Sequence, residues 1–96
     1  MTSLGPFELN IIKRKIIEKL YFFSPRTLTW GNLKLDVDDP QEEDFNPALA
    51  YLVHENIVEE TDGDYTLTAA GMEIFTDQGK FAEYFPLADV PRTNFG

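Results

Sequence analysis

The sequence contains no cysteine among its 96 residues. It therefore has no disulfide and no thiolate metal centre, which fits a reducing compartment, and we expect a cytoplasmic protein. No run approaches the roughly 18 apolar residues of a membrane-spanning helix. Residues 1–6 also lack the basic segment that opens a signal peptide, so we expect neither secretion nor membrane insertion.

Lysine and arginine are missing from the 45 residues between Lys34 and Lys80, a stretch that carries thirteen carboxylates. The net charge of −9 is therefore the sum of two parts of the chain with opposite charge. Six basic and two acidic residues give residues 1–35 a charge of +4, whereas two basic and fifteen acidic residues give residues 36–96 a charge of −13. Lysine and arginine supply most of the affinity of proteins for phosphate backbones, so the acidic part is not expected to bind nucleic acid conventionally.

The composition indicates one folded domain. Hydrophobic residues make up 43% of the chain and aromatic residues 14%, which is enough apolar surface for a single core at this length. Residues 86–96 contain two prolines and show no hydrophobic periodicity. We therefore predict a domain over residues 1–85 and a C-terminal tail over residues 86–96.

The clearest predicted element is a helix over residues 7–23. Ile12, Ile16 and Leu20 recur at steps of four, which is typical of a helix with one face on a core. Pro25 disfavours helical backbone at the residue before it, so the helix should end at residue 23.

Two further helices are predicted before residue 56. Thr29 follows a short extended segment and suits the N-cap of a helix that begins at Trp30. Asp39, Pro40 and Glu42 could start one helical turn, but Asn46 and Pro47 are the stronger start signal, so a third helix is predicted over residues 46–55.

A β-hairpin is predicted after the third helix. Residues 57–61 and 64–68 resemble strands, and Asp62 and Gly63 between them are a residue pair favoured in a type I′ turn. The remaining predicted helices are one capped by Thr68 and one over residues 81–85.

This order of elements, together with a specific segment, resembles the winged helix-turn-helix domains of small bacterial and archaeal transcription regulators. The segment comprises Ala48, Leu49, Leu52, Val53, Asn56, Ile57, Val58, Glu59, Glu60, Gly63, Tyr65, Leu67, Thr68 and Gly71. The resemblance implies a small α+β domain with a three-helix core, a β-hairpin wing and an extra C-terminal helix. It also implies that the helix over residues 46–55 occupies the place of the DNA-reading helix.

The charges on that helix and wing do not suit DNA. The helix offers Tyr51, His54 and Glu55, and the wing around Gly63 carries only acidic charges. Juxtaposed like charges cost several kcal/mol at an interface, so the resemblance is extended to the fold and not to the DNA-reading residues.

Catalytic and metal sites are not expected. His54 is the sole histidine, and no nucleophile with a matching base is visible. Asp36 and Asp38 begin with the spacing of a calcium loop, but Pro40 stands at a ligand position and the required glycine is missing. We therefore expect no enzyme, no metal and no cofactor.

Two functions are open from the sequence. The favoured one is a regulatory protein-interaction module that binds a protein partner through Phe7, Ile11, Phe22, Tyr51, His54 and Glu55. The alternative is a DNA-binding transcription regulator that contacts DNA through the basic first helix, with Lys13, Arg14, Lys15 and Lys19.

A second apolar line on the first helix, Phe7, Ile11 and Phe22, predicts that another surface covers it. We favour a homodimer that also uses the C-terminal helix. The alternative is a cover from the chain's own C-terminal segment, with Phe81, Phe85, Leu87 and Phe95 as candidates. The predicted core comprises Leu9, Ile12, Ile16, Leu20, Phe23, Trp30, Leu33, Leu49, Leu52, Val53, Ile57, Tyr65 and Leu67.

Overall fold

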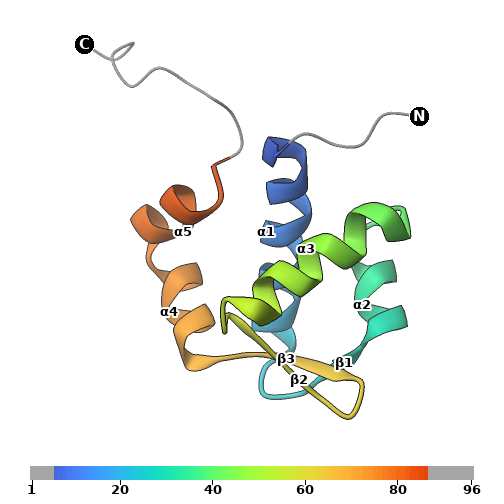
Figure 1. Ribbon diagram of the computed structural model, residues 1–96. Coiled ribbons are helices and arrows are strands. Elements are labelled where there is room, and N and C mark those ends of the chain that lie inside the picture. Colours follow the sequence, from blue (N-terminus) through green and yellow to red (C-terminus); the bar gives the residue numbers. More distant parts are fainter. Residues whose placement is uncertain (1–5, 87–96) are drawn as a thin grey trace.

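The computed structural model describes residues 6–86, which form a small α+β domain with five helices and one antiparallel sheet over this range (Figure 1). The elements are α1 (Pro6–Phe23), β1 (Leu28–Thr29), α2 (Trp30–Asp36), α3 (Glu42–His54), β2 (Val58–Thr61), β3 (Asp64–Leu67), α4 (Ala69–Thr76) and α5 (Gln78–Tyr84). The three strands lie in the order β1-β3-β2. The predicted α+β class is thus confirmed.

The long helix α1 forms the centre of the domain. It contacts α2, α3, α4 and β3, and in Figure 1 α3 crosses in front of it while α4 and α5 lie on one side. Its predicted stripe is confirmed, because Ile12, Ile16 and Leu20 are buried. Ile17 is also fully buried, since neighbours on several sides of α1 require a wider apolar face than one stripe.

The prediction that Phe23 belongs to the core is wrong. Phe23 is 36% exposed, and the guanidinium of Arg26 lies 5.8 Å from the centre of its ring. Phe23 is the last residue of α1, so its position in the stripe does not bring burial.

The local signals for caps and turns are confirmed. The Thr29 hydroxyl accepts a hydrogen bond from the Asn32 amide and caps α2. Asp62 and Gly63 have φ of 54° and 86°, the two positive values of a type I′ turn, and the hairpin pairs Glu60 with Tyr65.

The Thr68 hydroxyl links three elements. It donates to the carbonyl oxygens of Asn56 (2.7 Å) and Ile57 (3.0 Å), and it accepts from the Gly71 amide (3.0 Å). Asn56 has the predicted left-handed backbone, with φ of 62°. The end of α3 and the start of α4 are therefore held together at the base of the hairpin.

The third helix starts earlier than predicted. α3 begins at Glu42 instead of Asn46, and it accommodates Pro47 although a proline cannot donate to the carbonyl of Glu43. Phe45 explains the difference, because its side chain is fully buried in the turn that precedes the predicted start. Its ring meets the Trp30 ring edge-on at 5.7 Å, and burial of a phenylalanine outweighs one lost hydrogen bond.

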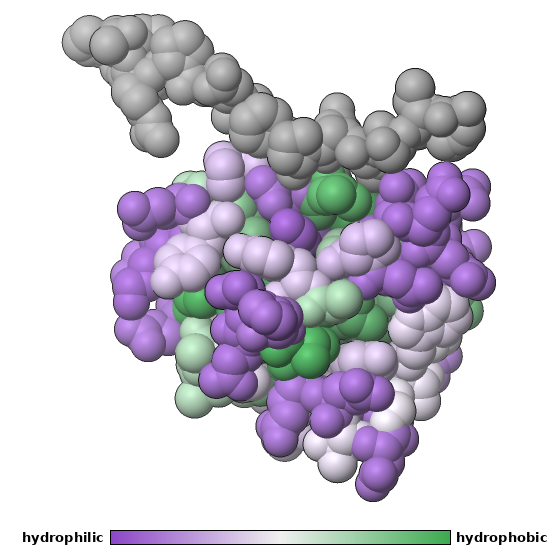
Figure 2. Space-filling model, viewed as in Figure 1, coloured by the Kyte–Doolittle hydropathy of each residue, from purple (hydrophilic) through white to green (hydrophobic). Residues whose placement is uncertain are grey.

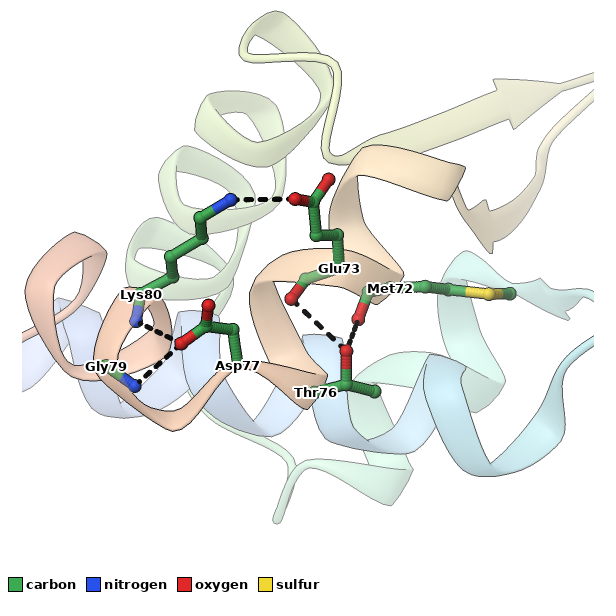
Figure 3. A network of polar contacts seen from close by, with 6 residues as sticks. All are labelled: Met72, Glu73, Thr76, Asp77, Gly79 and Lys80. Carbon is green, nitrogen blue, oxygen red and sulfur yellow. Dashed lines mark hydrogen bonds and ion pairs between the residues drawn. The ribbon is translucent and has the colours of Figure 1, made fainter.

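The last helix also starts earlier than predicted, at Gln78 instead of residue 81. The carboxylate of Asp77 accepts hydrogen bonds from the amides of Gly79 (3.0 Å) and Lys80 (3.2 Å), which caps α5 (Figure 3). The ammonium of Lys80 donates to Glu73 at 2.7 Å. The corner between α4 and α5 is therefore fixed by side chains from both helices.

The C-terminal segment packs on α1. Phe85 is fully buried, the Arg14 Nε donates to the Phe85 carbonyl (2.8 Å), and the Asn10 side-chain amide donates to the Pro86 carbonyl (2.8 Å). The chain thus covers part of α1 itself. Leu87 and Phe95, two other candidate covers, lie outside the described residues.

The buried core confirms most of the prediction and extends it. Predicted residues that are buried or packed against the core are Leu9, Ile12, Ile16, Leu20, Trp30, Leu33, Leu49, Leu52, Val53, Ile57, Tyr65 and Leu67.

Residues 6–86 include no helix with the length and apolar character needed to cross a membrane.

Candidate functional site

A groove between α3 and the β-hairpin is the candidate site. It has a volume of about 500 Å³. Its apolar lining consists of two aromatic walls, Trp30 and Tyr65, and a floor of Leu49, Ala50 and Val53, and its polar lining is Asn46, His54 and Glu60. On the face that α3 crosses, hydrophobic surface is visible between hydrophilic side chains (Figure 2).

The two aromatic walls are held in place by neighbouring residues. The indole Nε1 of Trp30 donates to the Asn46 side-chain oxygen at 2.8 Å, and its ring rests edge-on against Phe45. Tyr65 is in the central strand β3, where its backbone pairs with Leu28 on one side and Glu60 on the other. The groove therefore has walls fixed before any ligand binds.

Glu60 is the only acidic residue in the lining of the groove. Partial burial raises the pKa of the Tyr65 phenol, and the negative charge of Glu60 raises that pKa further. Within the described residues no ion pair neutralises Glu60. The groove thus combines aromatic surface with one uncompensated carboxylate.

The structure does not bring the predicted partner-binding residues together. His54 lines the groove, and Glu55 lies beside it with a carboxylate oxygen 3.3 Å from the His54 Nδ1. Tyr51 instead lies on the other side of α3. There the Lys13 ammonium is 3.9 Å from the centre of the Tyr51 ring, and the Phe85 ring packs edge-on against it. Tyr51 and His54 are therefore on different sides of α3.

Ile11 and Phe22 belong to a second apolar surface, and the side chain of Phe7 lies outside the described part of the chain. Ile11 is 40% exposed and Phe22 is 68% exposed. Phe75 lies near both, since it lines a hollow of about 270 Å³ with Ile11 and meets the Phe22 ring edge-on at 6.3 Å. This surface is formed by α1, α4 and α5, away from the groove.

Most cations of the alternative DNA site are already engaged. Lys13 lies over the Tyr51 ring, and burial lowers the pKa of its ammonium. Arg14 donates to the Phe85 carbonyl and lies 4.7 Å from the centre of the Phe81 ring. Lys15 pairs with Asp38, so three of the four predicted contacts have partners within the domain; the fourth, Lys19, is half-buried.

Sequence reasoning missed the groove because it assigned four of its five apolar lining residues to the core. Trp30, Val53 and Tyr65 are only partly buried and form the floor and walls of a surface feature. The predicted two-residue turn was the available signal. It fixes the register of the hairpin and pairs Glu60 with Tyr65, which both line the groove.

Comparison with known proteins finds no protein-family model, curated protein or solved structure that matches this chain. Among the side chains that the structure describes, those of residues 9–77 and 79–86, no three histidine or acidic groups lie closely enough together to hold a metal ion. The groove is therefore interpreted from its own geometry and charge.

The ion pair between Lys15 and Asp38 should make stability depend on acid. A hydrogen bond from Lys15 and the charge of Lys15 lower the pKa of Asp38 from its ordinary value of 3.8. A carboxyl with a lowered folded-state pKa stabilises the fold above pH 3.8, and this contribution is lost as the pH falls through the folded pKa.

The Asp38→Asn variant should therefore melt below the wild type at neutral pH, and the difference should shrink in acid. Asn tolerates the left-handed backbone at this position, where φ is 72°. Thermal melting across acidic pH measures the effect, and the Asp36→Asn variant controls for the loss of a nearby charge. A difference that stays constant with pH would contradict a role for the ion pair.

Proposed function

We propose that this chain is a non-enzymatic winged-helix module that binds a protein partner, with a regulatory role. The order helix, strand, helix, helix, hairpin, helix is compatible with that fold. In it, α3 would stand where the family reads DNA and the hairpin would be the wing. The observation that carries the proposal is the groove between these two elements, which is apolar and has a carboxylate as its one acidic group.

The charge of the α3 and hairpin surface supports a protein partner over DNA. No lysine or arginine occurs between residues 34 and 80, which include all of α3 and the hairpin. Exposed carboxylates at Glu55, Glu59 and Asp62 would face phosphates on conventional docking. Such contacts are repulsive and release no counterions, whereas an apolar groove gains free energy when a partner covers it.

The alternative, DNA binding through α1, has less support. Arg14 would have to leave the Phe85 carbonyl and Lys15 would have to leave Asp38 before either contacted a phosphate. Each exchange reduces the net gain from a phosphate contact, since an existing interaction is lost.

Formation of a homodimer is a prediction separate from the binding of a protein partner. The exposure of Ile11 and Phe22 supports a homodimer through α1. The buried Phe85 and the bonds from Asn10 and Arg14 to the C-terminal segment weaken that reason, since the chain covers part of α1 itself.

The proposed function is tested by substituting arginine for an alanine in the groove. The Ala50→Arg variant places a long cationic side chain in the groove from an exposed helical position. Protein partners captured from a nuclease-treated lysate of the source organism should decrease by about tenfold or more, the loss expected when a central contact is removed. Ala82→Arg makes the same change at an exposed position of α5 and should capture like the wild type.

The DNA alternative is tested with the same preparations. Titration with labelled random duplex at low salt should show no binding stronger than about 10⁻⁴ M. Micromolar binding that the Lys13→Ala/Lys15→Ala double variant abolishes would overturn the proposal in favour of a DNA-binding regulator. Equal capture by the wild type and Ala50→Arg would remove the groove from the proposed function.

A further inference from the structure

We propose that the groove binds an arginine side chain carried by an apolar segment of the partner protein. This inference rests on the proposed function and adds the chemical group that the groove recognises. Three features of the groove support it: its aromatic walls, its single carboxylate and its apolar floor.

The aromatic walls suit a planar cation. Trp30 and Tyr65 line the same groove, and the indole is held by its hydrogen bond to Asn46. A guanidinium stacks on aromatic faces and is attracted by their π electrons, most strongly by tryptophan. It is also more weakly hydrated than an ammonium, so it loses less on entering a partly buried site.

The carboxylate supplies the matching charge. Glu60 pairs with Tyr65 across the hairpin, and both line the groove, so the carboxylate lies at its aromatic wall. A guanidinium can donate two parallel hydrogen bonds to one carboxylate, which are stronger than bonds between neutral groups. The chain offers no cation of its own between residues 34 and 80 to take this place.

The floor accounts for the apolar part of the ligand. Leu49, Ala50 and Val53 come from successive turns of α3 and present hydrocarbon beside the aromatic walls. An arginine carries three methylene groups that bury against such surface while its charged end pairs. Apolar neighbours of the arginine would cover the rest of the floor.

Other ligands fit the groove less well. A fully apolar occupant would bury the Glu60 carboxylate without a partner, which is costly, and an acidic occupant would be repelled by it. The second hollow, beside Ile11 and Phe81, shows nothing that indicates its occupant.

The test uses three blocked tripeptides that differ only at the central position: Leu-Arg-Leu, Leu-citrulline-Leu and Leu-Glu-Leu. Citrulline has the shape of arginine without its charge. Trp30 is the only tryptophan of the chain and lines the groove, so its fluorescence and its indole N–H resonance report on binding there. We expect the arginine peptide to bind at least about tenfold more tightly than the citrulline peptide, and the glutamate peptide to bind least.

The Glu60→Gln variant should remove most of the preference for arginine over citrulline. Glu59→Gln is the matched control, because successive residues of β2 point to opposite faces and Glu59 pairs with Thr66, outside the groove. It makes the same charge change and should keep the preference. Unchanged circular dichroism would show that both variants keep the fold.

The outcomes separate the two proposals. Equal binding of the arginine and citrulline peptides, or an equal effect of Glu59→Gln and Glu60→Gln, would overturn the arginine site while the groove remains a protein-binding site. Absence of any shift at Trp30 with all three peptides would also overturn it. The proposed function fails separately, when Ala50→Arg leaves partner capture unchanged.

Discussion

Replacing Phe85 with alanine should lower the free energy of unfolding by about 3–5 kcal/mol, the usual cost of removing a fully buried phenylalanine ring. The residue follows the last helix, yet none of its surface is exposed. Its ring packs edge-on against Tyr51 at 6.5 Å and Phe81 at 6.1 Å, which joins the C-terminal segment to α3 and α5. Urea unfolding monitored by circular dichroism measures the loss.

Tyr84→Ala is the control for Phe85→Ala. Tyr84 is the preceding residue and is 50% exposed, so its removal should change the free energy of unfolding by only about 0.5 kcal/mol. A loss below about 1 kcal/mol for Phe85→Ala would show that the C-terminal segment does not complete the core.

Light scattering on the Ile11→Glu variant tests the homodimer independently. A homodimeric wild type should have twice the mass of the 11.0 kDa chain. A variant with the mass of one chain would then support pairing through α1, whereas a variant with the same mass as the wild type would not.

Replacing Gly71 with alanine should cost about 3 kcal/mol, although this change normally stabilises a helix interior by up to about 1 kcal/mol. The reversal follows from contact with the hairpin. A Cβ at residue 71 would lie 2.4 Å from the Ile57 carbonyl oxygen and 2.8 Å from a Leu67 methyl carbon. That carbonyl also accepts bonds from the Thr68 amide and hydroxyl, both at 3.0 Å, so it cannot move without breaking the link between hairpin and helix.

Gly31→Ala provides the opposite case within the same protein. Gly31 is in α2, and a Cβ there would have no neighbour within 4 Å. The variant should therefore gain up to about 1 kcal/mol from helix propensity alone. Thermal melting should move the two variants in opposite directions from the wild type. Stabilisation by both would show that α4 can shift away from the hairpin at little cost.

The elements that short-range signals specify agree with the sequence-based predictions. The end of α1 before Pro25 and the caps at Thr29 and Thr68 are as predicted, because each depends on residues a few positions apart. The type I′ turn at Asp62 and Gly63 agrees for the same reason.

The differences come from contacts between distant residues. α3 extends back to Glu42 because the Phe45 ring packs against Trp30, which lies in a different helix. No periodicity in residues 38–46 signals that contact. From the sequence, Phe85 is predicted only as a candidate cover of α1, and it belongs to the core through contacts with α1 and α3, which are far from it in the sequence.

The charge of the candidate site can be predicted from the sequence, but its shape cannot. The absence of lysine and arginine between residues 34 and 80 is enough to indicate an acidic surface. The division of α3 into one side that faces the groove, with His54, and another that faces α1, with Tyr51, depends on where Trp30 and the hairpin pack. Partial burial of Trp30 and Tyr65 is also a tertiary property, since the same residue types in the same pattern occur in closed cores.

The way in which α1 holds the C-terminal segment bears on which substitutions the protein can accept. Asn10 and Arg14 donate to main-chain carbonyls, and every amino acid supplies a carbonyl. A change of side chain at residue 86 would therefore keep the bond from Asn10, whereas a change of Asn10 or Arg14 itself would remove a bond that the segment cannot replace. Variation among natural forms of this domain should be freer at residue 86 than at these two positions on α1.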